Sequence, residues 1–413
     1  MTAAVQDKGI EIVPEKSELA EKYPTFSEDI YGEASIAAPY GHYRALRALG
    51  PVVYLPAQDV LVVSRYKDVK AALLDHRTFT SGEGIALNGI ANAIGRGTMI
   101  ASDPPIHSTL RGIMGAPLLP KAVAELKSQV ATAAQDLVRR LASRGNFDGV
   151  ADFARYLPVS IVSTLVGLPE AGRENMLDWA AAAFDSLGPE NGRFSRAMPK
   201  LQQMLDYILH SAGPTDVTPG SWAARIYEAA EAGMIAREQV PALLLDYLAP
   251  SLDTTIFATA HLLHQLGCQP EQWRLLKNDR SLIANAIEEV IRFEPALRGF
   301  ARVTSDAIVI DGTIVPASSR VLLLYASANR DEDKFDDPDV FDVTRADAKD
   351  HLGFGKGRHA CAGQHLARLE MQCLLEALVE EIAEINVGDP TIQSNNILRG
   401  FASLPVEVRR HAA

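Results

Sequence analysis

The spacing of apolar residues constrains the fold of this chain more than any other feature of its sequence. Apolar residues recur at every third or fourth position over the stretches Ala122 to Leu141, Ala242 to Leu266 and Ala362 to Ile385. That spacing gathers apolar side chains on one face of a helix, which can then be buried. The sequence therefore predicts a mainly α-helical fold.

Short runs of β-branched residues interrupt the helical pattern. Pro51 to Leu55 and Val60 to Val63 predict one hairpin, and Ala307 to Ile310 with Thr313 to Val315 flank an Asp311-Gly312 turn. Strands and helices do not alternate regularly, so a doubly wound parallel sheet is disfavoured. We expect a mainly α fold with a small β region.

Two segments are typical of mobile loops. Ser81 to Gly97 is rich in glycine and asparagine, and Ser211 to Ser221 is rich in glycine, proline and threonine. Neither resembles an interdomain linker, and we find no internal repeat or low-complexity tract. We expect a polar N-terminal extension at residues 1–30 and one large domain at residues 31–413.

Composition and charge narrow the function classes. The 40 basic and 52 acidic side chains give a formal charge of -12, which opposes binding to nucleic acid or anionic lipid. We find neither an apolar run of about 18 residues nor a secretory signal pattern, so we expect no membrane partner. Three scattered cysteines, Cys268, Cys361 and Cys373, are too few for a disulfide framework, which favours a cytoplasmic location.

One cysteine lies in an unusual setting. The segment from Phe354 to Gly363 places three glycines around Cys361, directly before a strongly helical stretch. The N-terminus of a helix favours thiolate over thiol, and glycines let a large planar cofactor approach the backbone closely. A haem iron with one axial thiolate fits these requirements. Cys268 and Cys373 are more simply read as small apolar residues.

The pattern FGxGxHxCxG resembles the haem-thiolate signature of the cytochrome P450 family. Glu289 to Arg292 is similar to the ExxR motif of that family, and Arg345 to its third, ion-paired arginine. The resemblance extends over nearly the whole chain. It implies a single-domain cytochrome P450 fold and haem b with Cys361 as the axial metal ligand. It also implies that Glu289, Arg292 and Arg345 form a structural network that braces the cysteine segment.

The resemblance also assigns the haem contacts. Asp103-Pro104-Pro105 precedes His107 and Arg111, which lie four residues apart and hence on one helical face, similar to the propionate-binding helix of the family. The cofactor-binding residues that it implies are His107, Arg111, Arg302, Phe354, Gly355, His359 and Cys361.

The segment from Pro250 to Thr255 resembles the oxygen-binding helix of the family. It implies that Asp253 and Thr254 are the catalytic acid and alcohol that relay protons, whereas the hydroxyl of Thr255 is expected to bond to a carbonyl one turn earlier. Pro250 and Ser251 replace the usual alanine and glycine. Because proline has no N–H and clashes with the preceding turn, we predict a kink here that holds the helix open.

Within the family, the chain most resembles bacterial enzymes that O-demethylate para-methoxybenzoate. The matching stretches are residues 50–55, 188–191, 327–331 and 398–405. This resemblance implies a compact aromatic pocket. The expected walls are Leu87, Ile94, Phe184, Leu252, Leu297, Phe300 and Phe401.

The anchor for a substrate carboxylate is less well matched. Arg96 and Thr98 lie near the positions of the arginine and serine that hold benzoate in those relatives, but one residue closer together. A second Arg-Ser pair of the relatives is replaced by Leu245-Asp246, and an ionised Asp246 would repel a carboxylate by on the order of a few kcal/mol. Two alternatives stay open: Arg96 or Arg298 supplies the charge, or a neutral phenol, aryl ether or terpenoid bonds to Asp246.

The expected function is that of a haem-thiolate monooxygenase. It would insert one atom of O₂ into a small aromatic substrate, by hydroxylation or O-demethylation, with electrons from a 2Fe–2S ferredoxin and a separate ferredoxin reductase. Lys356, Arg358 and Arg368 are candidates for the ferredoxin-docking patch. The alternatives are a terpenoid hydroxylase of the same family, a non-catalytic haem-binding sensor and peroxide-driven oxygenation. The last two are disfavoured because neither explains the Asp253-Thr254 pair.

Overall fold

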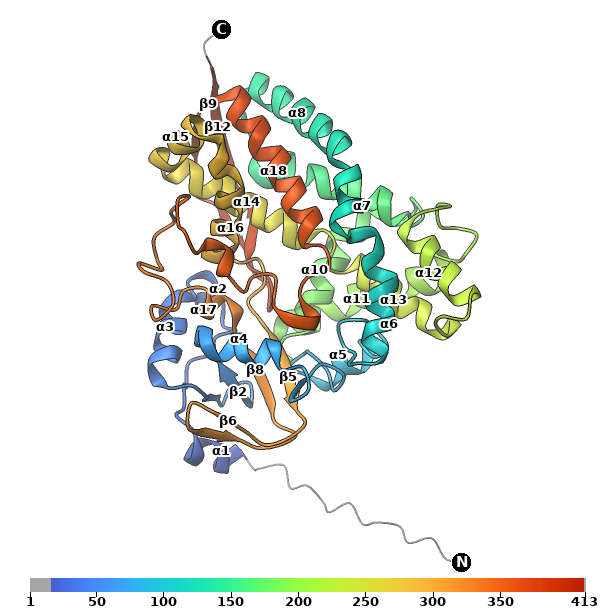
Figure 1. Cartoon of the computed structure of the whole chain (residues 1–413), viewed down its shortest axis with the longest axis vertical. Coiled ribbons are helices and arrows are strands. Elements are labelled where there is room, and N and C mark those ends of the chain that lie inside the picture. The colour runs from blue at the N-terminus through green and yellow to red at the C-terminus, as the bar shows by residue number, and fades with distance from the viewer. Residues whose placement is uncertain (1–15, 412–413) are drawn as a thin grey trace, which may run out of the picture.

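The computed structural model describes residues 16–411, and helices make up most of this part of the chain (Figure 1). The helices are α1 (Lys16–Lys22), α2 (Glu33–Ala37), α3 (Tyr40–Leu49), α4 (Tyr66–Leu74), α5 (Gly89–Ile94), α6 (Ile106–Gly115), α7 (Pro120–Glu125), α8 (Lys127–Arg144), α9 (Ser163–Val166), α10 (Met176–Ser186), α11 (Gly192–Ser211), α12 (Trp222–Glu231), α13 (Val240–Leu248), α14 (Asp253–Cys268), α15 (Pro270–Asn278), α16 (Ile283–Phe293), α17 (Tyr325–Ala328) and α18 (Gln364–Glu381). The predicted mainly α class is confirmed.

The strands are short and gather in separate small sheets. They are β1 (Val53–Leu55), β2 (Val60–Val63), β3 (Phe79–Thr80), β4 (Asn146–Asp148), β5 (Phe300–Thr304), β6 (Ile308–Ile310), β7 (Thr313–Val315), β8 (Arg320–Leu323), β9 (Ile382–Val387), β10 (Thr391–Gln393), β11 (Gly400–Ser403) and β12 (Pro405–Arg410). Both predicted hairpins are present, as the antiparallel pairs β1–β2 and β6–β7.

The short helical turns complete the secondary structure. They are η1 (Ala116–Leu118), η2 (Gly149–Ala154), η3 (Pro158–Val162), η4 (Arg173–Asn175), η5 (Arg237–Gln239), η6 (Arg280–Leu282), η7 (Ala348–Asp350) and η8 (Gly357–His359). The last of these turns lies just before Cys361, so it belongs to the segment that carries the cysteine.

The largest sheet has the strand order β1-β2-β8-β5-β3, with β2 and β8 parallel and its other pairs antiparallel. Because side chains alternate between the two faces of a strand, this sheet divides two apolar clusters. Val60 and Val62 pack with the N-terminal helix α3, whereas Leu61 and Val63 face the main core. The sheet therefore joins the N-terminal part of the chain to the helical body.

Two predicted helices differ from the structure at their boundaries. The stretch Ala122 to Leu141 is divided between α7 and α8 at Leu126. The stretch Ala362 to Ile385 is helical only to Glu381, because the chain then enters strand β9 and pairs with β12. The apolar spacing did not predict the end of the helix at Glu381, because pairing of β9 with the distant strand β12 outweighs the local preference for helix.

One predicted loop is partly helical. Within Ser81 to Gly97 the structure forms α5, whose first turn is capped by the Asn88 side chain accepting from the Ala91 N–H. The asparagine therefore marks a helix start rather than mobility. The second predicted loop, Ser211 to Ser221, is confirmed as the connection between α11 and α12.

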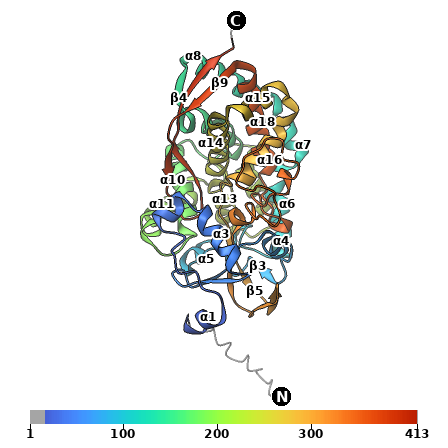
Figure 2. The same ribbon diagram turned by 90° about the vertical axis from the view of Figure 1, so that its left-hand side faces the viewer.

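The long helices surround a buried central helix. Helix α14 is buried on nearly all sides, whereas the apolar spacing of Ala242 to Leu266 predicted one buried face. Helices α13 and α14 follow one another through the middle of the molecule (Figure 2). Helices α8 and α18 lie alongside each other (Figure 1). The N-terminal end of α18 is thereby held in the interior.

The predicted N-terminal extension falls partly outside the described residues, which begin at Lys16. Within residues 16–30, Tyr23 and Ile30 are buried, and Thr25 forms a bridge to Tyr54 in β1. The second half of the expected extension thus packs on the sheet. The division of the chain at residue 30 stays a prediction.

One described segment, Gly149–Val166, is by length and composition alone apolar enough to cross a membrane. In the structure 56% of it is buried inside the fold. A core helix of a folded domain can have the same length and composition, so this segment gives only weak support for a membrane partner.

Candidate active site

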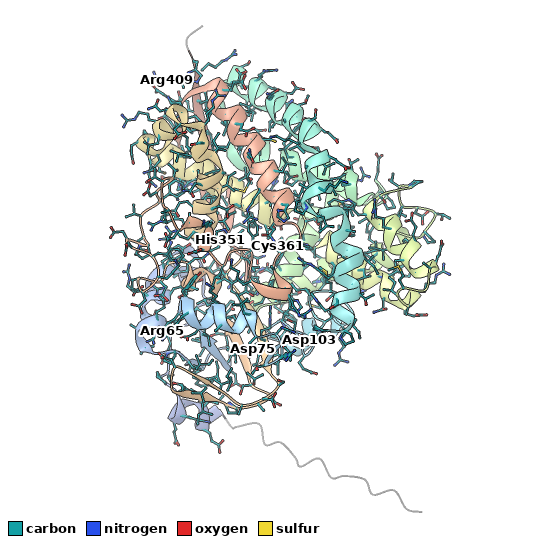
Figure 3. All side chains as sticks on the ribbon, viewed as in Figure 1. Arg65, Asp75, Asp103, His351, Cys361 and Arg409 are labelled. Atoms are coloured by element: carbon teal, nitrogen blue, oxygen red, sulfur yellow. The ribbon has the colours of Figure 1, made fainter. Side chains whose placement is uncertain are left out.

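The cysteine loop, residues 352–363, ends at the N-terminus of α18. Cys361 lies near the centre of the molecule (Figure 3). The Cys361 N–H donates to the Phe354 carbonyl at 2.8 Å, which closes the loop. Gly357 has a φ of +70°, and a Cβ there would lie 2.7 Å from the Leu73 carbonyl oxygen. Glycine is therefore required by both backbone conformation and space.

The thiol of Cys361 is subject to opposing electrostatic effects. Burial raises its pKa, whereas the backbone N–H groups of Gly363 and Gln364 and the guanidiniums of Arg111 and Arg368 lower it. The net direction is upward because burial outweighs the other effects, although the N–H groups at the start of α18 lower the pKa as the sequence predicted. A bound metal ion deprotonates a coordinating thiol outright, and the N–H groups then stabilise the thiolate.

Cys361 opens on an internal cavity of about 330 Å³. Helices α6, α13, α14 and α18, the cysteine loop and strand β5 all contribute to its walls. Every cofactor-binding residue predicted from the sequence lies on these walls: His107, Arg111, Arg302, Phe354, Gly355, His359 and Cys361.

Four of these residues form a cationic cluster, defined as His107, Arg111, Arg302 and His359. The centroids of the His107 and His359 imidazole rings are 4.3 Å apart. Both ring nitrogens of His107 and Nε2 of His359 are buried without a hydrogen-bond partner in the described part of the chain. Burial and the neighbouring cations lower the pKa of both histidines.

This arrangement fits an anionic cofactor. Buried polar groups nearly always have hydrogen-bond partners, and two guanidiniums beside two imidazoles suit a pair of carboxylates. Gly353, Gly355 and Gly363 of the cysteine loop line the same cavity as the sulfur. The residues therefore fit haem b, with its propionates at the cationic cluster and its iron at Cys361.

The predicted structural network is present behind the cysteine loop. Glu289 on α16 accepts from Arg292 Nε at 2.7 Å and from Arg345 Nε at 3.1 Å, and Glu289 and Arg292 are fully buried. Arg292 also donates to the carbonyls of Asn329 and Pro338. The network thus fixes the segment 329–345, which leads into the cysteine loop.

A second ionic network was not predicted. Glu288 accepts from His351 Nε2 at 3.0 Å and from Arg368 Nε at 2.6 Å, and its pKa is lowered to about 2 by hydrogen bonds and charge from these partners despite burial. It joins α16 to both ends of the cysteine loop. Arg368 also lies over the ring of Phe354, so its main contacts are within the fold.

The predicted kink on the opposite wall is present. Helix α13 ends at Leu248 and α14 begins at Asp253, with Pro250 between them. The single helix predicted from Ala242 to Leu266 is therefore two helices. Proline has no N–H to donate to the Asp246 carbonyl, which accounts for the break.

Two hydroxyls bond back across this break. Thr254 Oγ1 donates to the Pro250 carbonyl at 3.3 Å, and Ser251 Oγ donates to the Tyr247 carbonyl. The sequence predicted a hydroxyl bond of this kind for Thr255, but in the structure it is Thr254 that makes the bond. All three hydroxyl residues line the cavity.

Asp253 is buried next to Thr254 but does not lie on the cavity wall. Burial raises the pKa of its carboxyl to about 7, while the charge of Arg155 lowers it and that of Asp178 raises it. Its Oδ2 has no hydrogen-bond partner among residues 16–411. The structure thus places the carboxyl and the hydroxyl on different sides of α14.

The predicted substrate residues divide into two groups. Those on the cavity wall are Thr98, Phe184, Asp246, Leu297 and Phe300, together with Ile94. Those away from it are Leu87, Arg96, Leu252, Arg298 and Phe401.

The residues away from the wall have identifiable places in the fold. Arg298 is buried, and its guanidinium donates to Tyr43 Oη and to the Ile30 carbonyl, so it holds the N-terminal segment rather than a substrate. Arg96 is exposed to solvent. Phe401 packs 4.4 Å from the His261 ring, and Leu252 belongs to the core. The interpretation of these side chains as pocket walls is corrected accordingly.

Several wall residues were missed. They include Met99, Ile100, Leu187, Leu245, Ala249, Ser251, Ala296, Tyr325 and Glu370. Most of them are apolar, and the sequence around an apolar residue does not show whether its side chain lines a cavity or packs in the core. Glu370 is different, because a fully buried carboxyl in the middle of a helix is rare, and burial raises its pKa to about 8.

A partly buried cysteine on a glycine-rich loop, which lines one internal cavity together with a cationic cluster, defines the class of haem-thiolate proteins. The family model of cytochrome P450 matches residues 228–385. Cytochrome p450 CYP199A2 of Rhodopseudomonas palustris is 34% identical over 93% of this chain and 94% of its own. Cyclomarin C epoxidase CymV of Salinispora arenicola is 33% identical over 89% of this chain and 95% of its own.

Solved structures agree with these relatives. Cytochrome P450 CYP268A2 of Mycobacterium marinum, in complex with pseudoionone, has a TM-score of 0.83 and 26% identity, covering 93% of this chain and 99% of its own. This chain belongs to the cytochrome P450 family and is a monooxygenase with haem b bound through an axial cysteine thiolate.

Proposed function

We propose that this monooxygenase inserts one atom of O₂ into a small aromatic substrate, by hydroxylation or O-demethylation. The observation that carries the proposal is the single cavity that brings Cys361 and Thr254 together with the aromatic rings of Phe184 and Phe300. A mainly apolar pocket of this kind suits a compact aromatic molecule. The resemblance to enzymes that O-demethylate para-methoxybenzoate supports the same class of substrate.

Residues of the cysteine loop, α6 and β5, all of which line the cavity, would bind the cofactor. The Cys361 sulfur would bind the haem iron, and the cationic cluster would hold the propionates. When bound, the haem supplies activation of O₂, which the electron density of the thiolate promotes. The Glu289 and Glu288 networks keep the cysteine loop in place, so that the sulfur position does not depend on the cofactor alone.

Thr254 is proposed to move protons within the cavity. Its hydroxyl donates to the Pro250 carbonyl, which leaves the oxygen lone pairs free to accept a proton-bearing partner. Asp253 holds a proton near neutral pH because burial raises its pKa to about 7. We propose that this carboxyl resupplies Thr254 through water, because the two side chains are adjacent in the chain but face different sides of α14.

The break at Pro250 is proposed to hold the helix open at this point in the absence of any ligand. A helix that continued through residue 250 would cover the Pro250 carbonyl, to which Thr254 now bonds. The opening is thus built into the backbone.

Electrons are proposed to come from a 2Fe–2S ferredoxin and a separate ferredoxin reductase. Arg358 is exposed and Lys356 partly exposed, and both belong to the loop that carries Cys361. Arg368, the third predicted docking residue, is paired with Glu288 and contributes less to such a surface. A cytoplasmic location stays a prediction.

The proposed substrate class is tested by spectral titration of the purified holoprotein. We expect small aryl ethers and phenols to displace water from the site and to shift the haem towards high spin, because the cavity is small and largely apolar. Matched terpenes of similar volume serve as the comparison. A shift with terpenes alone would favour a terpenoid hydroxylase instead.

Replacing Thr254 by alanine is expected to leave haem and substrate binding intact but to divert most of the consumed reducing equivalents to peroxide. Removing one proton-transfer group typically costs about 10²–10⁴-fold in the step that it serves. The measurement is product formed and peroxide released per NADH consumed. Thr255→Ala is the matched control, and fully coupled oxygenation in Thr254→Ala would contradict the assigned relay.

A further inference from the structure

Asp246 is the charged residue on the cavity wall contributed by α13. Its Oδ2 accepts from the Met99 N–H, which ties α13 to the segment that precedes α6. The side chain is only partly buried because it has accessible surface inside the cavity. A carboxylate offers about four lone-pair sites, so acceptor capacity remains that faces the cavity.

The charges that line the cavity are unevenly distributed. In the part of the chain that the structure describes, the cations on its walls are Arg111 and Arg302, and the imidazoles of His107 and His359, whose pKa is lowered, lie beside them in the cationic cluster. Haem propionates bound at this cluster would neutralise the two guanidiniums and accept hydrogen bonds from the imidazoles. Asp246 and Glu370 are the acids on the walls, and Glu370 comes from α18, on the side of the cysteine loop.

We infer that Asp246 anchors the substrate by accepting a hydrogen bond from its hydroxyl or amine group, and that it selects against carboxylates. The inference rests on the proposed function and specifies its substrate class. The substrate is then a compact aromatic molecule with a hydrogen-bond donor remote from the position that is oxidised.

The electrostatics of the site favour a substrate that donates a hydrogen bond over one that carries a carboxylate. Burial raises the pKa of Asp246 to about 7, while hydrogen bonds from the Met99 and Ile100 N–H groups lower it. Above that pH the group is an anion in a largely apolar cavity, where like charges repel strongly. Arg96, the residue predicted to balance a substrate carboxylate, is exposed to solvent and does not line the cavity.

A purely structural role for Asp246 predicts a different pattern. If the carboxyl only fastened the segment around Met99, its replacement would weaken the binding of all ligands alike. An anchor instead changes affinity according to the charge and donor capacity of the ligand. The ranking of matched ligands therefore separates the two roles.

The experiment uses three probes with the same methoxyphenyl ring: para-methoxybenzoate, para-methoxybenzyl alcohol and para-methoxybenzylamine. Affinities for the holoprotein are measured above pH 7 by haem spin-state titration and by calorimetry. We expect the wild type to bind the alcohol or the amine at least about 10-fold more tightly than the benzoate, a difference of about 1.4 kcal/mol. If the amine binds more tightly than the alcohol, the substrate is cationic. If the alcohol binds more tightly, the substrate is neutral.

Asp246→Asn keeps an acceptor for the Met99 N–H and removes the charge. It is expected to raise benzoate affinity and to lower amine affinity, each by about 10-fold. The matched control is Asp185→Asn, since Asp185 is, like Asp246, a partly buried carboxyl with a raised pKa, here of about 6, that accepts from the Asn396 N–H and does not line the cavity. The control is expected to leave the ranking of the three probes unchanged.

Three outcomes would overturn the inference: equal wild-type affinity for benzoate and alcohol, an equal loss for all three probes in Asp246→Asn, or no binding of any probe to a holoprotein with a normal thiolate spectrum. Failure of the proposed function has a different signature. The absence of a thiolate spectrum or of aryl oxygenation would contradict that function, while the calorimetric ranking would still decide the inference about Asp246.

Discussion

Glu289→Gln is expected to lower the free energy of unfolding by about 3–5 kcal/mol, the usual cost of removing one partner from a buried ion pair. The carboxylate of Glu289 is fully buried and neutralises two guanidiniums, Arg292 and Arg345. Without its charge both cations stay buried and poorly paired. The measurement is urea unfolding of the holoprotein followed by far-UV circular dichroism, together with the amount of haem retained.

An exposed ion pair provides the control for this prediction. Glu384 pairs with Arg409 at the surface, between β9 and β12. Glu384→Gln is expected to change stability by less than about 1 kcal/mol, because solvent screens such pairs. Equal effects of the two substitutions would show that the buried network does not brace the cysteine loop.

Cys361→His is expected to abolish the strongly red-shifted absorption of the reduced carbon monoxide complex and, with it, oxygenation of any substrate. An imidazole can bind iron, but it donates far less electron density than a thiolate. The measurement is the absorption spectrum of the reduced protein with carbon monoxide, supported by product analysis.

The other two cysteines give matched controls. Cys268 is exposed at the end of α14 and Cys373 is buried within α18, and neither lies on the cavity wall. Cys268→Ser and Cys373→Ala are both expected to keep the red-shifted band. Retention of that band in Cys361→His would exclude Cys361 as the ligand.

The sequence was most informative where chemistry fixes the residue type at each position. Glycines that adopt positive φ, a metal-binding cysteine and a carboxylate that neutralises two arginines tolerate few substitutes, so the cofactor contacts could be predicted from local patterns. All of the predicted haem contacts lie on one cavity. The hairpins were predictable for a similar reason, since turn residues and alternation are local signals.

Long-range packing was less accessible from the sequence. Glu288 has the same local context as many exposed helix acids, and only the fold brings His351 and Arg368 to it. Arg298 could not be distinguished from a substrate anchor until its bonds to Tyr43 and Ile30 were known. Whether a side chain faces a cavity or the core depends on tertiary structure, and five of the eleven predicted substrate residues lie away from the cavity wall.

The central claim is that the sulfur of Cys361 is bonded to haem iron. X-ray absorption at the iron edge of the full-length ferric holoprotein tests it most directly, because sulfur and nitrogen neighbours scatter differently. We predict one sulfur neighbour in addition to the porphyrin nitrogens, and its loss in Cys361→His. Iron surrounded by nitrogen and oxygen alone in the wild type would contradict the claim.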